Sequence, residues 1–331
     1  MKAFPSLLLG PWSEVQVFDL IQYLVDGLAV GSVYALIALG YSMVFGVLQL
    51  VNFAHGELFM VGAYFVMYAI SLGLPWPMAL FLGMVFVGLF AVIMERLCYK
   101  PLRGAGKLAP LITAVGLSLL LQNLVQAVLG PNPQSYPVQL PEGKISNFLS
   151  SIRKSPDEIV LPQLPDGLFD WENLVIRHRD LLIFGVAVGV TFALELFLRK
   201  TRPGRGIRAL ALQPNAARLV GVPFDFTISL TFFIGAALAV VAGLLQGMAD
   251  NQVTPYMGIT SGLKAFAAAV LGGIGVIPGA LVGGLVLGIA ERLLVGYDLS
   301  TYKDGAAFFI LILVLLLRPQ GLLGKARMVK V

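Results

Sequence analysis

Residues 199–221 read RKTRPGRGIRALALQPNAARLVG, and they decide how the rest of the chain is arranged. The stretch contains six Lys and Arg residues and no Asp or Glu, and strongly apolar segments flank it on both sides. Lys and Arg in short loops between membrane spans resist translocation, so we expect this stretch to lie in the cytoplasm. The simplest interpretation is that it only sets the orientation of the chain.

The same stretch also predicts a short helix. Pro214 suits the first position of a helix, and Gly221 can close its end in the left-handed conformation. We expect Ala217, Leu219 and Val220 to form one apolar face on this helix. A short amphipathic helix on the cytoplasmic surface would suit the groove of a partner protein.

The composition indicates a membrane protein. Of the 331 residues, 58% are apolar and only 12% are charged, whereas soluble domains carry about 25% charged residues. The basic residues lie in loops between apolar runs, which argues against a nucleic-acid partner. One cysteine excludes an internal disulfide framework, and two histidines leave little for a zinc site. We therefore predict no metal site and no cofactor.

The apolar runs predict an all-α fold, a polytopic transmembrane helical bundle that forms a single domain over residues 1–331. We expect roughly 8–9 spans, with one or two broken or short helices. Gly46–Gly56 and Ser261–Leu271 are the weak points of the count, since either could be a half-helix that enters the membrane and returns. The expected spans are Leu20–Phe45, Glu57–Leu72, Pro75–Met94, Ala109–Leu129, Leu181–Leu198, Phe226–Met248, Ser261–Leu271, Gly279–Leu294 and Gly305–Leu317.

The loops predict an orientation for this bundle. Lys and Arg cluster at 95–108, 199–218 and 318–330, and all three clusters fall on one side of the membrane under this count. The C-terminus is then cytoplasmic and the N-terminus extracytoplasmic. Residues 130–180 are proline-rich and net acidic, and we expect them to form an extracytoplasmic loop.

Four glycines between residues 279 and 288 predict close helix packing. Gly279 with Gly283, and Gly284 with Gly288, form two overlapping small-xxx-small spacings. Such spacings let helix backbones approach closely in lipid.

Polar side chains at membrane depth are candidates for lining a translocation path, because they are costly in lipid and face the bundle interior. Asn52, His55, Glu57 and Lys264 are the candidates. Structural alternatives stay open: the helix dipole favours Glu57 at a helix start, and Lys264 could snorkel to the surface. Glu291, near an outer helix end, is interpreted as an anchor. No catalytic triad, carboxylate pair or GxxxxGK[ST] motif occurs, which argues against an intramembrane enzyme.

Several long motifs resemble the branched-chain amino acid permeases of ABC importers. The first is GLAVGSVYALIALGYSMVFGVLQLVNFAHGELFMVGAY at 27–64, and KPLRGAGKLAPLITAVGLSLLLQN follows at 100–123. GRGIRALALQPNAARLVGV at 204–222 and PYMGITSGLKAFAAAVLGGIGVIPGALVGGLVLGIAE at 255–291 match in the same order. The resemblance covers nearly the whole chain except residues 130–180.

The resemblance implies a non-catalytic permease subunit in a bacterial inner membrane, transporting leucine, isoleucine and valine. Its partners would be a second paralogous permease, two cytoplasmic ATP-binding subunits, an extracytoplasmic substrate-binding protein and membrane lipid. Residues 199–225 would be the loop that couples the chain to the ATPases. The coupling candidates in this loop are Arg205, Arg208, Gln213, Pro214, Asn215, Arg218 and Gly221.

Two alternatives remain open at this point. Urea and short-amide permeases share these motifs, so urea or a short amide is the alternative substrate. A stand-alone secondary transporter would predict inverted internal repeats and a site for a coupling ion. The sequence shows only a three-residue echo between Glu95–Leu97 and Glu291–Leu293, which chance explains.

The orientation can be tested by thiol labelling in a chain whose Cys98 is replaced by Ser. Single cysteines at Ser151 and Gln213 should react with a membrane-impermeant reagent from opposite sides, because the basic loop stays inside. Labelling of both positions from the outside would contradict the orientation.

Overall fold

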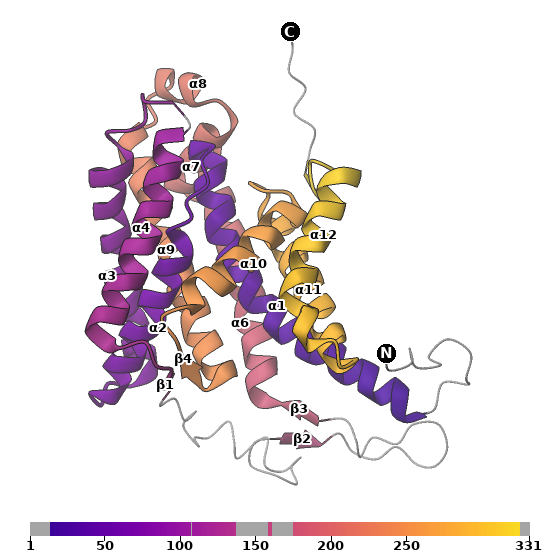
Figure 1. Ribbon diagram of the computed structural model, residues 1–331. Helices are drawn as coiled ribbons and strands as arrows, with labels where there is room; N and C mark the ends of the chain where they lie inside the picture. Colours follow the sequence, from indigo (N-terminus) through magenta and orange to yellow (C-terminus); the bar gives the residue numbers. More distant parts are fainter. Residues whose placement is uncertain (1–13, 107, 137–157, 161–174, 325–331) are drawn as a thin grey trace.

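The computed structural model describes residues 14–106, 108–136, 158–160 and 175–324, which fold almost entirely into helices (Figure 1). The helices are α1 (Glu14–Leu48), α2 (His55–Ser71), α3 (Trp76–Met94), the π-helix η1 (Glu95–Tyr99), α4 (Leu108–Leu129), α6 (His178–Lys200), α7 (Arg202–Leu212), α8 (Pro214–Leu219), α9 (Phe224–Asp250), α10 (Met257–Gly272), α11 (Ile277–Gly296), the 3-10 helix η4 (Ser300–Tyr302) and α12 (Lys303–Leu317).

The strands are short and lie together at one end of the bundle (Figure 1). Strand β1 (Gln134–Ser135) pairs antiparallel with β4 (Gln252–Val253), and β2 (Glu158–Val160) pairs antiparallel with β3 (Val175–Arg177). Most of the predicted loop at 130–180 lies outside the described residues.

The prediction of a polytopic all-α bundle is confirmed. Among the described residues, seven helices are long and apolar enough to cross a membrane. Two further helices are shorter, α2 with 17 residues and α10 with 16. Helix α2 begins at the end of the first predicted weak point, Gly46–Gly56, and α10 contains the second, Ser261–Leu271, because it begins earlier than expected, at Met257.

The core of the bundle is formed by α1 and α9, which are buried along most of their lengths. Helix α1 packs against α9, α10 and α11, while α3, α4 and α12 lie at the edges (Figure 1). The edge helices keep large apolar side chains exposed, as helices that face lipid do.

The predicted glycine packing is present, and each pair of glycines meets a different helix. A Cβ atom built on Gly284 would lie 2.5 Å from the backbone nitrogen of Ala35, so α11 touches the backbone of α1 there. Gly288 meets Gly31 of α1 in the same way, whereas Gly283 lies against the backbone of α10. Helix α11 therefore joins α1 and α10 through two glycine faces.

The break between α1 and α2 turns the chain back into the bundle. Residues 49–54 are irregular, and α2 begins beside the middle of α1, where the His55 imidazole fills the space that a Cβ on Gly40 would need. Gly56 packs directly on Gly258 and Gly262 of α10. Irregular backbone at this depth is tolerated because protein covers it.

The described parts of the basic clusters lie together at one end of the bundle. The α8 end holds α7, α8, the turn at 100–106 and the residues after α12, where the Leu322 N–H donates to the Leu271 carbonyl (Figure 1). The strand end holds β1 to β4 and the start of α1. The described residues of all three basic clusters therefore lie at the α8 end.

The glycine contact gives a stability test. Gly284→Leu should lower the free energy of unfolding by about 1–3 kcal/mol or more, because overpacking forces α1 and α11 apart. Gly116→Leu is the matched control, since nothing lies within 4 Å of a Cβ at that exposed position of α4. Thermal unfolding in detergent should show a lower Tm for Gly284→Leu alone. Equal melting of the two variants would mean that the contact is not tight.

Candidate functional site

Helix α7 places a row of arginines on the surface of the α8 end. The Thr201 hydroxyl caps this helix by accepting a hydrogen bond from the Gly204 N–H, at 3.1 Å. Gly204, Ile207 and Leu210 are buried, while the exposed side carries Arg202, Arg205 and Arg208. This helix was not predicted, although a capping threonine followed by Arg202 and Pro203 is a recognisable helix start.

Helix α8 has the ends that the sequence predicts. Pro214 is its first residue, and Gly221 follows it with a φ of +83°, in the left-handed region that favours glycine. Because α8 has only six residues, packing rather than intrinsic propensity must hold it in place.

The prediction of one apolar face on α8 is wrong. Ala217 is 3% exposed and packs on the bundle, whereas Leu219 and Val220 are 89% and 78% exposed. The reason is helical geometry: residues two apart point about 200° away from each other, and Val220 lies beyond the last turn. Helix α8 therefore packs on its own bundle through Ala217, and Leu219 and Val220 form an apolar tip that points outward. All seven coupling candidates are exposed beside that tip, namely Arg205, Arg208, Gln213, Pro214, Asn215, Arg218 and Gly221.

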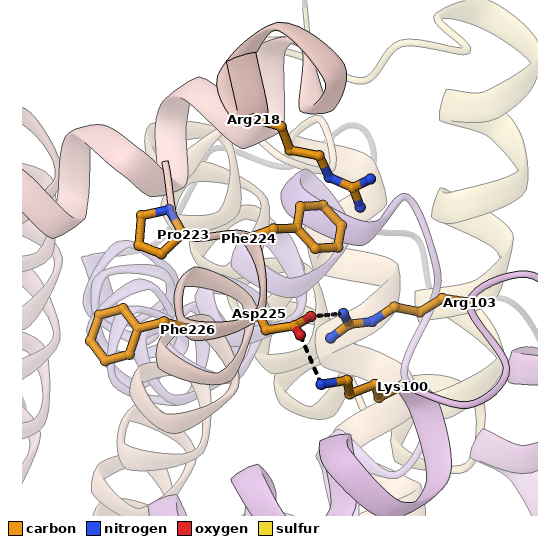
Figure 2. Close-up of a pocket in the computed structure, with 7 residues that line it drawn as sticks. All are labelled: Lys100, Arg103, Arg218, Pro223, Phe224, Asp225 and Phe226. Atoms are coloured by element: carbon orange, nitrogen blue, oxygen red, sulfur yellow. Dashed lines mark hydrogen bonds and ion pairs between the residues drawn. The ribbon is translucent and has the colours of Figure 1, made fainter. Parts of the chain in front are cut away.

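A hollow of about 580 Å³ opens between α8, the start of α9 and the turn after η1. The Arg218 guanidinium lies over the Phe224 ring, 3.7 Å from its centre. Asp225 accepts hydrogen bonds from Lys100 Nζ at 2.7 Å and from Arg103 Nη1 at 2.6 Å (Figure 2). The hollow is therefore rich in cations, but two of them are already paired with this carboxylate.

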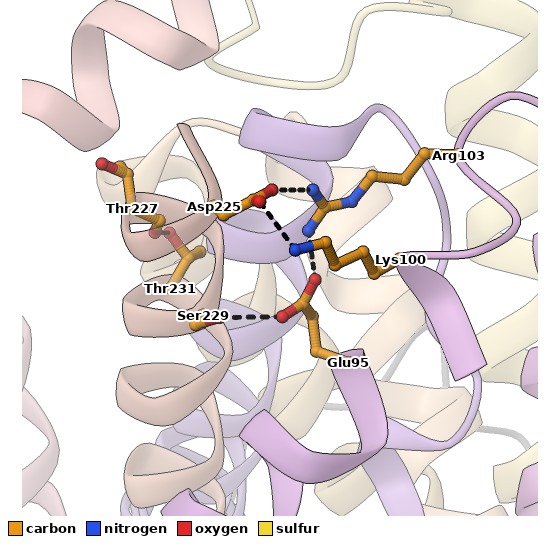
Figure 3. A network of polar contacts seen from close by, with 7 residues as sticks. All are labelled: Glu95, Lys100, Arg103, Asp225, Thr227, Ser229 and Thr231. Carbon is orange, nitrogen blue, oxygen red and sulfur yellow. Dashed lines mark hydrogen bonds and ion pairs between the residues drawn. The ribbon is translucent and has the colours of Figure 1, made fainter. Parts of the chain in front are cut away.

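A buried carboxylate lies beneath the hollow. Glu95, at the start of η1, is 1% exposed and accepts hydrogen bonds from Arg103 Nη2 and from Ser229 Oγ, the latter at 2.8 Å (Figure 3). A buried charge is tolerated only when it is paired and hydrogen-bonded. Arg103 thus bridges η1 and α9 by binding Glu95 and Asp225 together. Nothing in the sequence pattern indicates this pairing.

Three of the predicted path candidates lie around the start of α2, and all are buried. The Tyr99 hydroxyl donates to Asn52 Oδ1 at 2.6 Å, and the His55 ring packs edge-on to Tyr41. Glu57 Oε1 accepts a hydrogen bond from Ser118 Oγ of α4 at 3.0 Å. The position of Glu57 in the first turn of α2 also agrees with the dipole interpretation.

The fourth candidate, Lys264, lies apart from the other three. Its Nζ is 2.9 Å from Glu291 Oε1 and 2.6 Å from Asp304 Oδ1, and the Tyr34 hydroxyl donates to Glu291 Oε2 at 2.8 Å. Lys264 is therefore held by ion pairs that join α10, α11 and α12. Because the side chain is buried, the alternative that it snorkels to the surface is wrong. The interpretation of Glu291 as a surface anchor is wrong, because that carboxylate is buried.

The two groups of candidates face opposite sides of α10. The glycines that meet the start of α2 are Gly258 and Gly262, and a Cβ on Gly258 would collide with the Glu57 carboxylate. Lys264 follows Gly258 by six residues, a rotation of about 240° around the helix. The structure thus does not bring Lys264 and Glu57 into one site. Among the described residues, no three His, Cys, Asp or Glu are grouped as metal ligands.

Comparison with known proteins places this arrangement among transport permeases. The family model for the permease component of branched-chain amino acid transport systems matches residues 23–317. The chain is 42% identical to the high-affinity branched-chain amino acid transport system permease protein BraD of Pseudomonas aeruginosa, over 96% of this chain and 99% of BraD. It is 39% identical to the corresponding permease protein LivH of Escherichia coli, with the same coverage of both chains. The family match includes both the α1–α2 break and α8.

The Lys264 ion pairs give a second stability test. Lys264→Met should destabilise the protein by on the order of 3 kcal/mol, because Glu291 would be left buried without its cation. Adding Glu291→Gln should restore part of that loss, since the uncompensated charge is then gone. The Tm of the purified protein measures both effects. A Lys264→Met variant that melts like the wild type would show that the pairs contribute nothing.

Proposed function

The chain belongs to the family of permease components of branched-chain amino acid transport systems, and we propose that it forms half of the path through an ABC importer. The transported substrates are leucine, isoleucine and valine, and ATP hydrolysis in partner subunits drives the transport. The chain itself carries no GxxxxGK[ST] motif with which to hydrolyse ATP.

The observation that carries this proposal is the outward tip of α8. Leu219 and Val220 project from the bundle, and exposed Leu212 precedes them at the end of α7. Exposed arginines flank this tip at positions 205 and 208. An apolar knob with a basic rim is suited to a groove in a soluble partner, where a central apolar anchor contributes most of the binding energy.

The proposal assigns partners to both ends of the bundle. Two ATP-binding subunits take the α8 end, which is then cytoplasmic, with residues 199–225 as the coupling loop. A second paralogous permease completes the path, and an extracytoplasmic binding protein delivers the amino acid at the strand end. The complex lies in a bacterial inner membrane with the N-terminus of this chain outside and the C-terminus inside.

The path itself runs past the start of α2. Asn52, His55 and Glu57 supply polar groups there, at the depth where the chain turns back into the bundle. Lys264 is a separate candidate on the other side of α10, where its ion pairs join α10, α11 and α12. Transport requires that the bundle alternate between two states, with ATP binding in the partners biasing the equilibrium.

Leu219→Asp tests the role of the tip directly. Placing a carboxylate in an apolar groove should weaken association with the ATP-binding subunits by about 2 kcal/mol or more, as expected for a central anchor. Leu72→Asp is the matched control, because Leu72 is 83% exposed at the strand end. Co-purification of the ATP-binding subunits with each variant is the measurement. If Leu219→Asp retains them as well as Leu72→Asp does, the tip is not the docking element.

A further inference from the structure

The ring of Phe224 lies between two guanidinium groups from distant parts of the chain. Arg218, in the last turn of α8, lies 3.7 Å from the ring centre, and Arg103, in the turn between η1 and α4, lies 5.3 Å from it. Both distances are within the ~6 Å over which a cation is attracted to an aromatic ring. The ring therefore connects α8 to the turn between α3 and α4 (Figure 2).

The Arg103 side of this contact is firmly held. Arg103 binds Asp225 at 2.6 Å and also donates to the buried Glu95, and its side chain is 17% exposed (Figure 3). Moving Arg103 away would leave Glu95 buried without a cation, which costs several kcal/mol. The turn at 100–106 therefore moves with the start of α9, to which Arg103 is joined through Asp225 and beside whose Phe224 ring it lies.

The turn leads directly into α4, whose inner side reaches the start of α2. Pro110, Ala114 and Ser118 are the buried residues along that side, spaced one helical turn apart. The Ser118 hydroxyl donates to the Glu57 carboxylate at 3.0 Å. A displacement of α4 thus changes the surroundings of Glu57, the acidic residue among the path candidates at the α2 start.

We propose that Phe224 is the positioning residue that passes a movement of α8 to α3 and α4, and through Ser118 to Glu57. This inference rests on the proposed function, because it needs an ATP-driven force on α8. Phe224 is also the first residue of α9, so α8 can move α9 through the backbone without the ring. The ion pairs of Asp225 join the start of α9 to the turn at 100–106. The ring adds the contact that links Arg218 of α8 with Arg103 of that turn. Removal of the ring should therefore separate docking from coupling.

The test uses the complete importer in proteoliposomes with its external binding protein and leucine. Phe224→Leu keeps an apolar side chain but removes the ring, whereas Phe224→Tyr keeps the ring. Phe226→Leu is the matched control, because Phe226 is 60% exposed two residues away and contacts neither arginine in this way. We expect Phe224→Leu to retain the ATP-binding subunits but to import about fivefold to tenfold less leucine per ATP hydrolysed. Phe224→Tyr and Phe226→Leu should transport like the wild type.

A double-mutant cycle adds a readout that a general loss of stability would not give. Arg218→Gln combined with Phe224→Leu should lower leucine import no further than Phe224→Leu alone, since both remove one contact. Additive losses would overturn the inference, as would equal import per ATP by Phe224→Leu and Phe226→Leu. Loss of the ATP-binding subunits from Phe224→Leu alone would also overturn it, because the ring would then serve docking. A wild-type chain that fails to assemble with those subunits would instead overturn the proposed function.

Discussion

The carboxylate of Glu95 is the constraint on which the α8 end of the bundle depends. It is buried at the end of a membrane helix, so it requires a cation and a hydrogen-bond donor, which Arg103 and Ser229 supply. Arg103 then reaches Asp225 and lies beside the Phe224 ring on which α8 rests. One buried charge thus fixes the positions of η1, the following turn and the start of α9. A helix as short as α8 needs packing contacts of this kind to hold it in place.

Short-range signals account for most of what could be predicted. Hydropathy located the spans, because a membrane segment must be apolar over its whole length. Pro214 and Gly221 located α8, because capping depends only on neighbouring backbone geometry. Gly284 and Gly288 indicated close packing, although the sequence could not say that their partner is α1. The start of α7 carries an equally local capping signal in Thr201, although the predicted helix in this loop begins only at Pro214.

Long-range contacts account for what could not be predicted. Glu291 was interpreted as an anchor because the sequence does not show that Lys264, Asp304 and Tyr34 converge on it. The path candidates were predicted as one set, but Glu57 of α2 lies against one side of α10 and Lys264 extends from the other side. The apolar residues of α8 were likewise assigned to one face, although a helix turns them to opposite sides. In each case the deciding quantity is a direction in space, which residue type alone does not contain.

In the proposed importer, ATP hydrolysis by partner chains drives amino acid import through this protein. The most direct test is uptake of radiolabelled leucine into proteoliposomes that hold this chain, the second permease and the ATP-binding subunits, with the binding protein outside and ATP inside. We expect uptake that requires enclosed ATP and ceases when either this chain or the ATP-binding subunits are omitted. Uptake that persists without the ATP-binding subunits, or that follows an ion gradient instead, would contradict ATP-driven import.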